Sequence, residues 1–197
     1  QNFDAIIATG SDNSARYFRY YFSHVPHIIR QNRTALALIN GNETNASLDG
    51  LARDIHEYFG LGCRNVSKIL LPRGYDPSDL VPAMHRYSHF VQHNKYANNY
   101  EYQKTILTMN RYSFIDTGAG LLRENDGLVS PIAVTYYGFY RNTGERDAYL
   151  EANSDRLQCI VADPGQVERS IAPGNAQRPG ISDYADGVDT MQFLCEL

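Results

Sequence analysis

The chain has 197 residues, of which 43% are hydrophobic and 20% charged, and its 18 basic and 22 acidic residues give a net charge of −4. This length fits one domain of ordinary size, and the apolar fraction excludes a disordered chain. No run of about 18 apolar residues occurs, so we expect no membrane span. No basic and apolar leader marks a secretory signal.

Charge and cysteine content exclude two further classes of protein. Residues 1–100 carry 10 basic and 8 acidic residues, an excess too small for a nucleic-acid-binding surface. We therefore expect no nucleic-acid partner. The three cysteines, Cys63, Cys159 and Cys195, form no Cys-x-x-Cys pair, so a zinc ribbon is excluded. An odd, widely spaced set of cysteines fits a reducing, cytoplasmic location.

The hydrophobic pattern alternates between strand and helix along the chain. It predicts strands at 3–8, 35–39, 66–71, 131–138 and 157–162, and helices at 12–22, 49–59, 79–93, 96–112, 143–153 and about 187–195. Ser47 or Asp49 can cap the helix at 49–59, and Asn142 with Glu145 resembles a capping box. A Gly/Pro-rich loop covers 172–180. This order predicts an α/β fold with a mostly parallel sheet flanked by helices.

The start of the chain is abrupt, because it begins at Gln1 without a Met and reads as a buried strand from Phe3. Natural N-termini usually carry some slack before the first core element. We therefore expect residues 1–197 to form a single, Cys-bearing domain that belongs to a longer protein.

Cys63 is the first candidate for chemistry. It lies between a predicted helix and a predicted strand, on a turn bordered by Gly60 and Gly62, with Arg64 and Lys68 close in sequence. Nearby cations favour the thiolate, which is the nucleophilic form of cysteine. Composition alone also fits a small buried cysteine that fills the turn. Thr9-Gly10-Ser11 ends the first strand and opens a helix, where free N–H groups can bind a phosphate, or where Ser11 is a simple helix cap.

Three histidines, at 85, 89 and 93, recur every four residues and are expected on one helical face. A zinc site of the His-Glu-x-x-His type needs a glutamate between them, but positions 86 and 88 are Arg and Ser. We therefore expect no metal site.

Several segments together resemble the acyl-CoA reductase family of the aldehyde dehydrogenase superfamily, which includes LuxC-type fatty acyl reductases. The segments are Ile7–Ser11, Leu38–Asn42, Gly60–Lys68, Val129–Pro131 and Pro173–Gly180. They occur in the family's order over nearly the whole chain. The resemblance implies the catalytic-domain fold of the superfamily, with the N-terminal cofactor-binding part of the longer protein missing.

The resemblance also implies a reaction. Cys63 would accept an acyl group from acyl-CoA or another activated acyl donor, and NADP or NAD would supply the hydride that releases an aldehyde. Thr9, Gly10 and Ser11 would contact the cofactor. The backbone N–H of Cys63 would stabilise the oxyanion. Self-association into a homo-oligomer is a further expectation from the resemblance.

Two positions depart from the superfamily pattern. The glutamate that activates water in hydrolytic aldehyde dehydrogenases is Leu38 in this sequence, with Glu43 out of register. The glutamate that holds the nicotinamide ribose is Gly127, with Asp126 beside it. Loss of the first suits a reductase, which must not hydrolyse its thioester. Two alternatives stay open: a CoA-independent or CoA-acylating aldehyde dehydrogenase, and a non-catalytic binding or assembly module.

Overall fold

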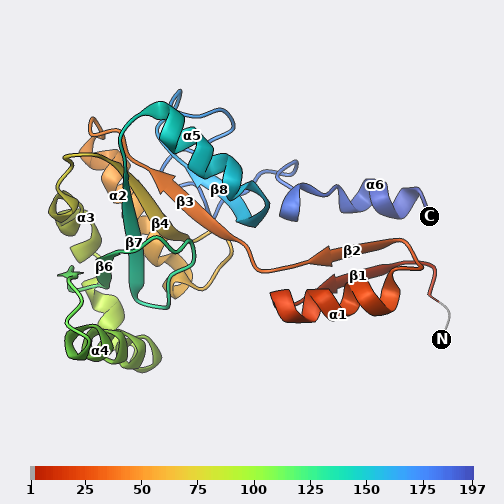
Figure 1. Cartoon of the computed structure of the whole chain (residues 1–197), viewed down its shortest axis with the longest axis horizontal. Helices are drawn as coiled ribbons and strands as arrows, with labels where there is room; N and C mark the ends of the chain where they lie inside the picture. Colours follow the sequence, from red (N-terminus) through yellow and green to blue (C-terminus); the bar gives the residue numbers. More distant parts are fainter. Residues whose placement is uncertain (1–2) are drawn as a thin grey trace. The chain divides into compact units, whose positions relative to one another are not determined.

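A computed structural model describes residues 3–197, and these residues form two compact units. Unit 1 contains residues up to Arg33 together with Pro179–Leu197, and unit 2 contains Thr34–Arg178. Each unit is built around parallel strands joined by helices (Figure 1).

Unit 2 is organised by a six-stranded sheet. In spatial order its strands are β5 (Ile115–Asp116), β6 (Leu121–Glu124), β7 (Val134–Tyr140), β4 (Val66–Pro72), β3 (Thr34–Leu38) and β8 (Leu157–Val161). All neighbouring pairs run parallel except β5 and β6. The predicted α/β fold with a mostly parallel sheet is therefore confirmed.

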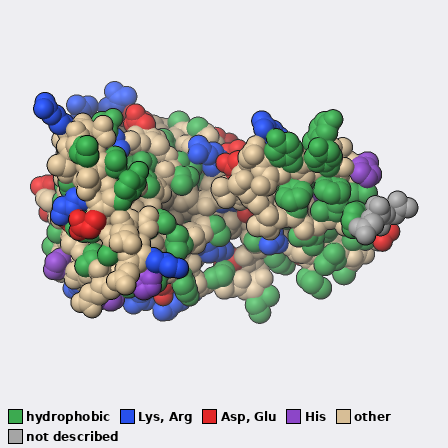
Figure 2. Space-filling view, turned by 90° about the horizontal axis from the view of Figure 1, so that it is seen from below, with side chains coloured by type: hydrophobic (Ala, Val, Ile, Leu, Met, Phe, Trp, Pro, Cys, Tyr) green, Lys and Arg blue, Asp and Glu red, His purple; other side chains and the backbone are tan. Residues whose placement is uncertain are grey.

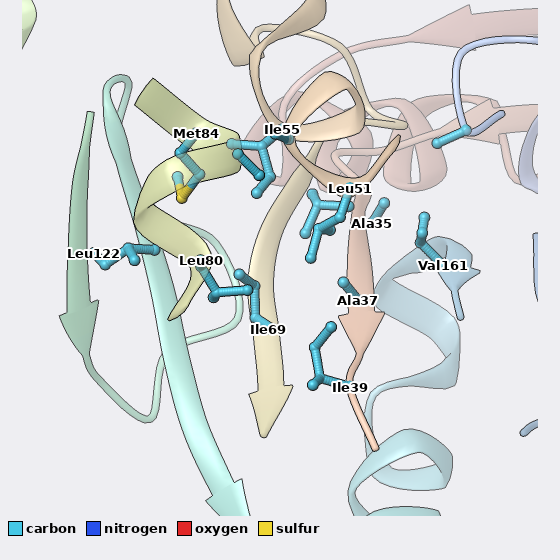
Figure 3. Packing of buried hydrophobic residues seen from close by; sticks show 14 of the residues in the cluster. Ala35, Ala37, Ile39, Leu51, Ile55, Ile69, Leu80, Met84, Leu122 and Val161 are labelled. Carbon is cyan, nitrogen blue, oxygen red and sulfur yellow. The ribbon is translucent and has the colours of Figure 1, made fainter. Parts of the chain in front are cut away.

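Helices cover both faces of this sheet, which explains why all five residues of β3 are buried. Helices α2 (Asn45–His56) and α3 (Val81–His85) pack on one face, where Leu51, Ile55 and Met84 meet alternate residues of β3 and β4 (Figure 3). Helix α5 (Thr143–Ala152) packs on the other face through Leu150. Helix α4 (Asn94–Met109) covers β6 and β7 with Tyr100 and Leu107.

Unit 1 contains a β-α-β segment and the C-terminal helix. Strands β1 (Ile6–Thr9) and β2 (His27–Arg30) pair in parallel and are joined by α1 (Asp12–Phe22). An Arg30 hydrogen bond of 3.0 Å to Thr190 links this segment to α6 (Thr190–Cys195). Large apolar side chains stay exposed here, and hydrophobic side chains gather over the part of the chain that carries α1 (Figure 2).

The long predicted helix over 79–93 is wrong. The segment contains a 3₁₀ turn at Pro77–Leu80, the short α3, and a second 3₁₀ turn at Ser88–Gln92. His93 is extended, with φ −85° and ψ 113°, and precedes α4. His85 ends α3, His89 lies in the second 3₁₀ turn and His93 lies between that turn and α4, so the expectation that they share one helical face is also wrong. The break lets Tyr87 and Phe90 pack around His56.

Other differences concern short strands and helix ends. Helix α2 begins at Asn45 because Thr44 caps it, its hydroxyl accepting from the Ser47 N–H at 3.1 Å. The sequence pattern misses β2, which directly follows Pro26, as well as β5 and β6. The predicted cap of α5 is confirmed, since the Asn142 side chain accepts from the Glu145 N–H at 2.9 Å.

Candidate active site around Cys63

Cys63 lies in a turn between α2 and β4 and is exposed, so the alternative of a small buried cysteine is wrong. The chain reaches this turn through Tyr58, Phe59 and Gly60, whose φ angles are 54°, 60° and 72°. Two consecutive non-glycine residues in the left-handed region cost on the order of 1–3 kcal/mol each, and such strain concentrates at functional sites. The packing of Phe59 against Phe90, with ring centroids 4.8 Å apart, helps to hold this conformation.

Asn65 is the residue that fixes the turn. Its side chain is 3% exposed and donates hydrogen bonds to the carbonyls of Asp54 at 2.9 Å and Glu57 at 2.8 Å. Its side-chain oxygen accepts from the Gly62 N–H at 2.8 Å, and its own N–H donates back to the Gly62 carbonyl at 3.0 Å. One amide therefore ends α2 and closes the loop that presents Cys63.

The backbone N–H of Cys63 is available for a ligand. Among residues 3–197, no hydrogen-bond acceptor is assigned to this N–H. A free N–H beside an exposed thiol is the arrangement that stabilises an oxyanion on a carbonyl attacked by sulfur.

A buried carboxylate joins α2 to the Gly/Pro-rich loop that follows β8. The oxygens of Asp54 accept from the N–H groups of Gly174 at 2.7 Å and Ala176 at 3.1 Å. Burial raises the pKa of Asp54 to about 6, while the two backbone hydrogen bonds oppose that shift. Gly50, one turn earlier, lets the loop approach, because a Cβ there would lie 2.6 Å from the Pro173 carbonyl.

The same loop reaches the Cys63 turn. The Arg64 guanidinium donates to the Ala176 carbonyl at 3.3 Å, so this cation is held beside the turn. A Cβ on Gly62 would lie 3.5 Å from the side-chain nitrogen of Gln177. The loop at 173–178 therefore forms one wall of the candidate site.

Two buried polar atoms border this region without a hydrogen-bond partner, namely Glu57 Oε2 and Gln177 Nε2. A buried polar group without a partner costs about 1–3 kcal/mol, so such atoms are rare and are found where a water or a ligand binds. Both residues belong to segments that touch the turn, since the Glu57 carbonyl accepts from Asn65.

Lys68 does not lend its charge to Cys63, contrary to the expectation from sequence proximity. Its side chain is 1% exposed, donates to the Asn125 carbonyl and lies against Gly138 of β7. Burial lowers the pKa of Lys68, and the charges of Asp126 and Glu124 oppose that shift. Lys68 instead holds the loop that carries Asp126, together with Ser67, which donates to the Leu128 carbonyl at 2.7 Å.

His56 lines a small cavity next to the turn. The cavity has a volume of about 30 Å³ and is bounded by Phe59 and Gly60 on one side and by Ser130 and Pro131 on the other. Its size suits one or two waters and is too small for an acyl chain. Burial lowers the pKa of His56 to about 4, helped by the nearby His89, and its Nε2 has no partner.

The remaining sequence-predicted residues lie elsewhere. Leu38 is 2% exposed at the end of β3. The Glu43 carboxylate accepts from the N–H groups of Asn40 at 2.6 Å and Gly41 at 3.0 Å, so it stabilises its own turn.

Thr9, Gly10 and Ser11 belong to unit 1, whereas Cys63 belongs to unit 2. The Ser11 hydroxyl caps α1 by accepting from the Ser14 N–H at 3.2 Å. A Cβ on Gly10 would lie 2.7 Å from that of Ser14, so this position requires glycine. Ser11 therefore has a capping role, and the predicted cofactor contact stays a prediction.

Neither a metal-binding cluster nor a membrane-spanning helix occurs among the described residues, 3–197. No group of three or more His, Cys, Asp and Glu side chains among them is placed to hold a metal ion. No helix in this part of the chain is both long and apolar enough to cross a membrane.

Asn65, Asp54, Glu57 and Gln177 were missed by sequence reasoning. Only Asp54 could have been found from the sequence, because it is a charged residue on the helix face that also carries the apolar Leu51 and Ile55, one turn after Gly50. The hydrogen bonds of Asn65 and the position of Gln177 depend on how the turn and the distant loop fold, which no local pattern records.

No protein-family model matches the sequence, and no curated protein matches it. Solved structures do match. An aldehyde dehydrogenase from Bacillus cereus, solved as its NAD⁺ complex, has a TM-score of 0.59 at 11% identity, over 81% of this chain and 39% of the other. AldH of Staphylococcus aureus, in its substrate-bound state, has a TM-score of 0.57 at 14% identity, over 89% and 43%.

An NAD-dependent aldehyde dehydrogenase from Sinorhizobium meliloti gives a TM-score of 0.56 at 12% identity, over 86% of this chain and 42% of the other. The chain therefore has the fold of an aldehyde dehydrogenase domain, and it spans about two fifths of the length of these structures.

Proposed function

We propose that this chain is the catalytic domain of an NAD(P)H-dependent acyl-CoA reductase, which converts a fatty acyl thioester to an aldehyde through an acyl-Cys63 intermediate. The observation that carries the proposal is the exposed Cys63 on a turn fixed by Asn65, in a chain with the aldehyde dehydrogenase domain fold. The sequence resemblance to acyl-CoA reductases favours this activity over the other activities of the superfamily.

The proposed chemistry uses groups of this chain. The Cys63 thiolate attacks the acyl carbonyl carbon, the new C–S bond forms, and the bond to the carrier thiolate breaks. The backbone N–H of Cys63 donates to the oxyanion. Arg64, held at the Ala176 carbonyl, places a fixed positive charge on the residue that follows Cys63.

Part of the described structure fits a nicotinamide cofactor. Asp126 is exposed on a loop held by Lys68 and Ser67, where a carboxylate can accept from ribose hydroxyls. Within unit 1, taken by itself, the N-terminus of α1 is a separate candidate for a phosphate contact, which Asp12 in the first turn of the helix opposes. NADP or NAD, when bound, would supply the hydride that reduces the thioester, and the Cys63 thiolate would then be the leaving group.

A second candidate is an aldehyde dehydrogenase that works in the oxidative direction. Leu38 and the engaged Glu43 provide no base for water, but Glu57 Oε2 is a buried acceptor without a partner next to the turn. A carboxylate in that position can activate water for thioester hydrolysis. Free acid formed from aldehyde without CoA, and lost in Glu57→Gln, would favour this second function.

The test is intact-mass analysis of the protein incubated with a long-chain acyl-CoA. We expect addition of one acyl group, which disappears in Cys63→Ser and persists in the matched control Cys159→Ser. An adduct that maps to Cys159 or Cys195 contradicts the proposal. The absence of any adduct favours the third reading, a binding or assembly module without catalysis.

A further inference from the structure

A second, larger cleft lies at the other end of strand β4. It has a volume of about 710 Å³ and is lined by residues that follow β4 and by residues at the end of β7 and the start of α5. Cys63 precedes β4, and the cleft begins at Arg73, directly after it. The seven residues of β4 separate the two by about 20 Å, at roughly 3.3 Å per residue, so this cleft is distinct from the Cys63 site.

The cleft coincides with a topological switch point of the sheet. Strands β4 and β7 are parallel neighbours, and their connections leave toward opposite faces. The chain after β4 enters α3, which packs with α2 through Met84, whereas the chain after β7 enters α5, which packs on the other face through Leu150. In open α/β sheets, ligands bind in the crevice outside the carboxyl ends of two such strands.

The walls of the cleft are held together by backbone hydrogen bonds. The Arg73 N–H donates to the Tyr140 carbonyl at 2.9 Å, and the Tyr75 N–H donates to the Pro72 carbonyl at 3.0 Å. Gly74 has φ +93°, and a Cβ there would meet no atom within 4 Å. These two hydrogen bonds hold the loop at 73–75 to the ends of β4 and β7. The side of Gly74 on which a Cβ would lie is open.

The charged groups of the cleft are unequally engaged. Arg141 donates to the Glu145 carboxylate from its Nε at 3.1 Å and from its backbone N–H at 2.8 Å. These hydrogen bonds from Arg141, with a smaller contribution from the charge of Arg73, hold the pKa of Glu145 below its ordinary value. The Arg141 guanidinium is therefore already paired with the carboxylate of Glu145.

Asp76 is engaged as well, because it accepts from the Ser78 N–H at 2.9 Å. The Arg73 side chain is exposed, and no hydrogen bond or ion pair of its guanidinium is found among residues 3–197. Arg73 is therefore the cleft's available cation, with its five N–H donors free for a carboxylate or phosphate.

An aromatic surface lies beside this cation. Phe139 lines the cleft and is 38% exposed although it lies in the central strand β7. Its ring packs edge-on against Tyr137, with centroids 5.8 Å apart. Tyr75 lines the same cleft. An exposed ring that lines the same cleft as a free guanidinium matches a ligand that carries both a flat ring and a negative charge.

We propose that this cleft binds a small organic anion with a flat ring, whose phosphate or carboxylate is held by Arg73 and whose ring packs on Phe139. A nucleoside monophosphate and an aromatic carboxylate share this chemistry. The site is independent of the Cys63 chemistry proposed above, because none of the residues that line it belongs to the Cys63 turn or to the loop at 173–178.

Calorimetric titration of the protein with AMP, benzoate and inorganic phosphate tests the proposal. We expect saturable binding of at least one ring-bearing anion, with a dissociation constant of about 0.1–1 mM, and binding of phosphate weaker by about tenfold. AMP alone would assign the site to nucleotides, and benzoate alone would assign it to aromatic carboxylates.

Two variants should change this affinity in opposite directions. Arg73→Met should weaken binding by about tenfold or more, because it removes the free guanidinium. Glu145→Gln should strengthen it about threefold to tenfold, because it releases Arg141 for the ligand. Arg156→Met, at an exposed arginine outside the cleft, is the matched control and should leave the affinity unchanged.

Three results would overturn the proposal. The first is no saturable binding of AMP or benzoate up to about 10 mM. The second is unchanged affinity in Arg73→Met. The third is phosphate binding as tightly as the ring-bearing anions, which would remove the role given to Phe139.

Discussion

The carboxylate of Asp54 accepts a hydrogen bond of 2.7 Å from the N–H of Gly174, 120 residues later in the chain. The pair connects the helix that leads to Cys63 with the loop that forms one wall of its site. Because Asp54 is fully buried, its ionisation affects both the stability of the fold and the geometry of the turn.

Asp54→Asn should change how stability depends on pH. The pKa of Asp54 is about 6 in the folded protein, above its ordinary value of 3.8, so the folded state binds more protons in this window. The contribution of Asp54 to the free energy of unfolding is therefore largest below about pH 4. It falls by about 3 kcal/mol, the equivalent of two pKa units, as the pH rises to 6. Urea unfolding between pH 3.5 and 7 should show this fall in the wild type relative to Asp54→Asn.

His56→Phe should reveal the opposite dependence. The pKa of His56 is about 4 in the folded protein, below its ordinary value of 6.5, so the folded state binds fewer protons. Stability from His56 is present above pH 6.5 and is lost as the pH falls to 4, by about 3 kcal/mol. In the wild type the two groups offset each other between pH 4 and 6.

His56→Phe keeps an aromatic ring against Tyr87 while it removes the titration. The two variants, measured by urea unfolding over the same pH range, should therefore diverge from the wild type with slopes of opposite sign. Curves that stay parallel to the wild type in both variants would contradict the assigned shifts in pKa.

Asn65→Ala should reduce the reactivity of Cys63. The substitution removes the bond to the Gly62 N–H and leaves buried carbonyls at the end of α2 without a donor. We expect a loss of about 2–3 kcal/mol in unfolding free energy and a fall of about tenfold or more in the rate of Cys63 acylation. Urea unfolding and intact-mass kinetics with acyl-CoA measure the two effects.

Asn153→Ala is the matched control for that experiment. The Asn153 side chain donates to the Tyr149 carbonyl at 2.8 Å at the end of α5, so it makes a comparable helix-end bond elsewhere in unit 2. It should lower stability and leave the acylation rate unchanged. An equal fall in rate in both variants would mean that Asn65 acts only through global stability.

Gly50→Ala should displace the loop at 173–178. The new Cβ would lie 2.6 Å from the Pro173 carbonyl, a backbone contact that cannot move aside cheaply. We expect a loss of about 1–3 kcal/mol in stability, although alanine is the better helix former. Gly144→Ala in α5 is the control and should be neutral or stabilising, because its Cβ would meet only the Asn142 side chain, at 3.3 Å. Equal stability of the two variants, measured by thermal unfolding, would contradict the close approach.

Most of the fold could be predicted from the sequence because its signals are local. The apolar strands β3, β4 and β8 and the capped helix α5 carry strong patterns, and each was placed within three residues at either end. The broken helix over 79–93 was not predictable in this way. Its helical periodicity was outweighed by long-range packing of Tyr87 and Phe90 on His56.

The candidate site could be predicted only in part. The turn that carries Cys63 could be placed from the glycines beside it, but the exposure of its thiol could not, and Lys68, five residues away, donates to the Asn125 carbonyl. Alternation along a strand decides which face a residue occupies, and sequence proximity to Cys63 does not. Asn65 gave no signal because its partners are backbone atoms whose positions depend on the turn itself.

The Arg64 bond to the Ala176 carbonyl has a consequence for how the protein matures. A ribosome adds residue 176 more than a hundred residues after Cys63, so the wall formed by this loop is completed only after most of unit 2 has been synthesised. A nascent chain that already contains Cys63 therefore lacks the loop at 173–178 until later in translation. The timing of translation itself delays the assembly of the candidate site until nearly all of unit 2 exists.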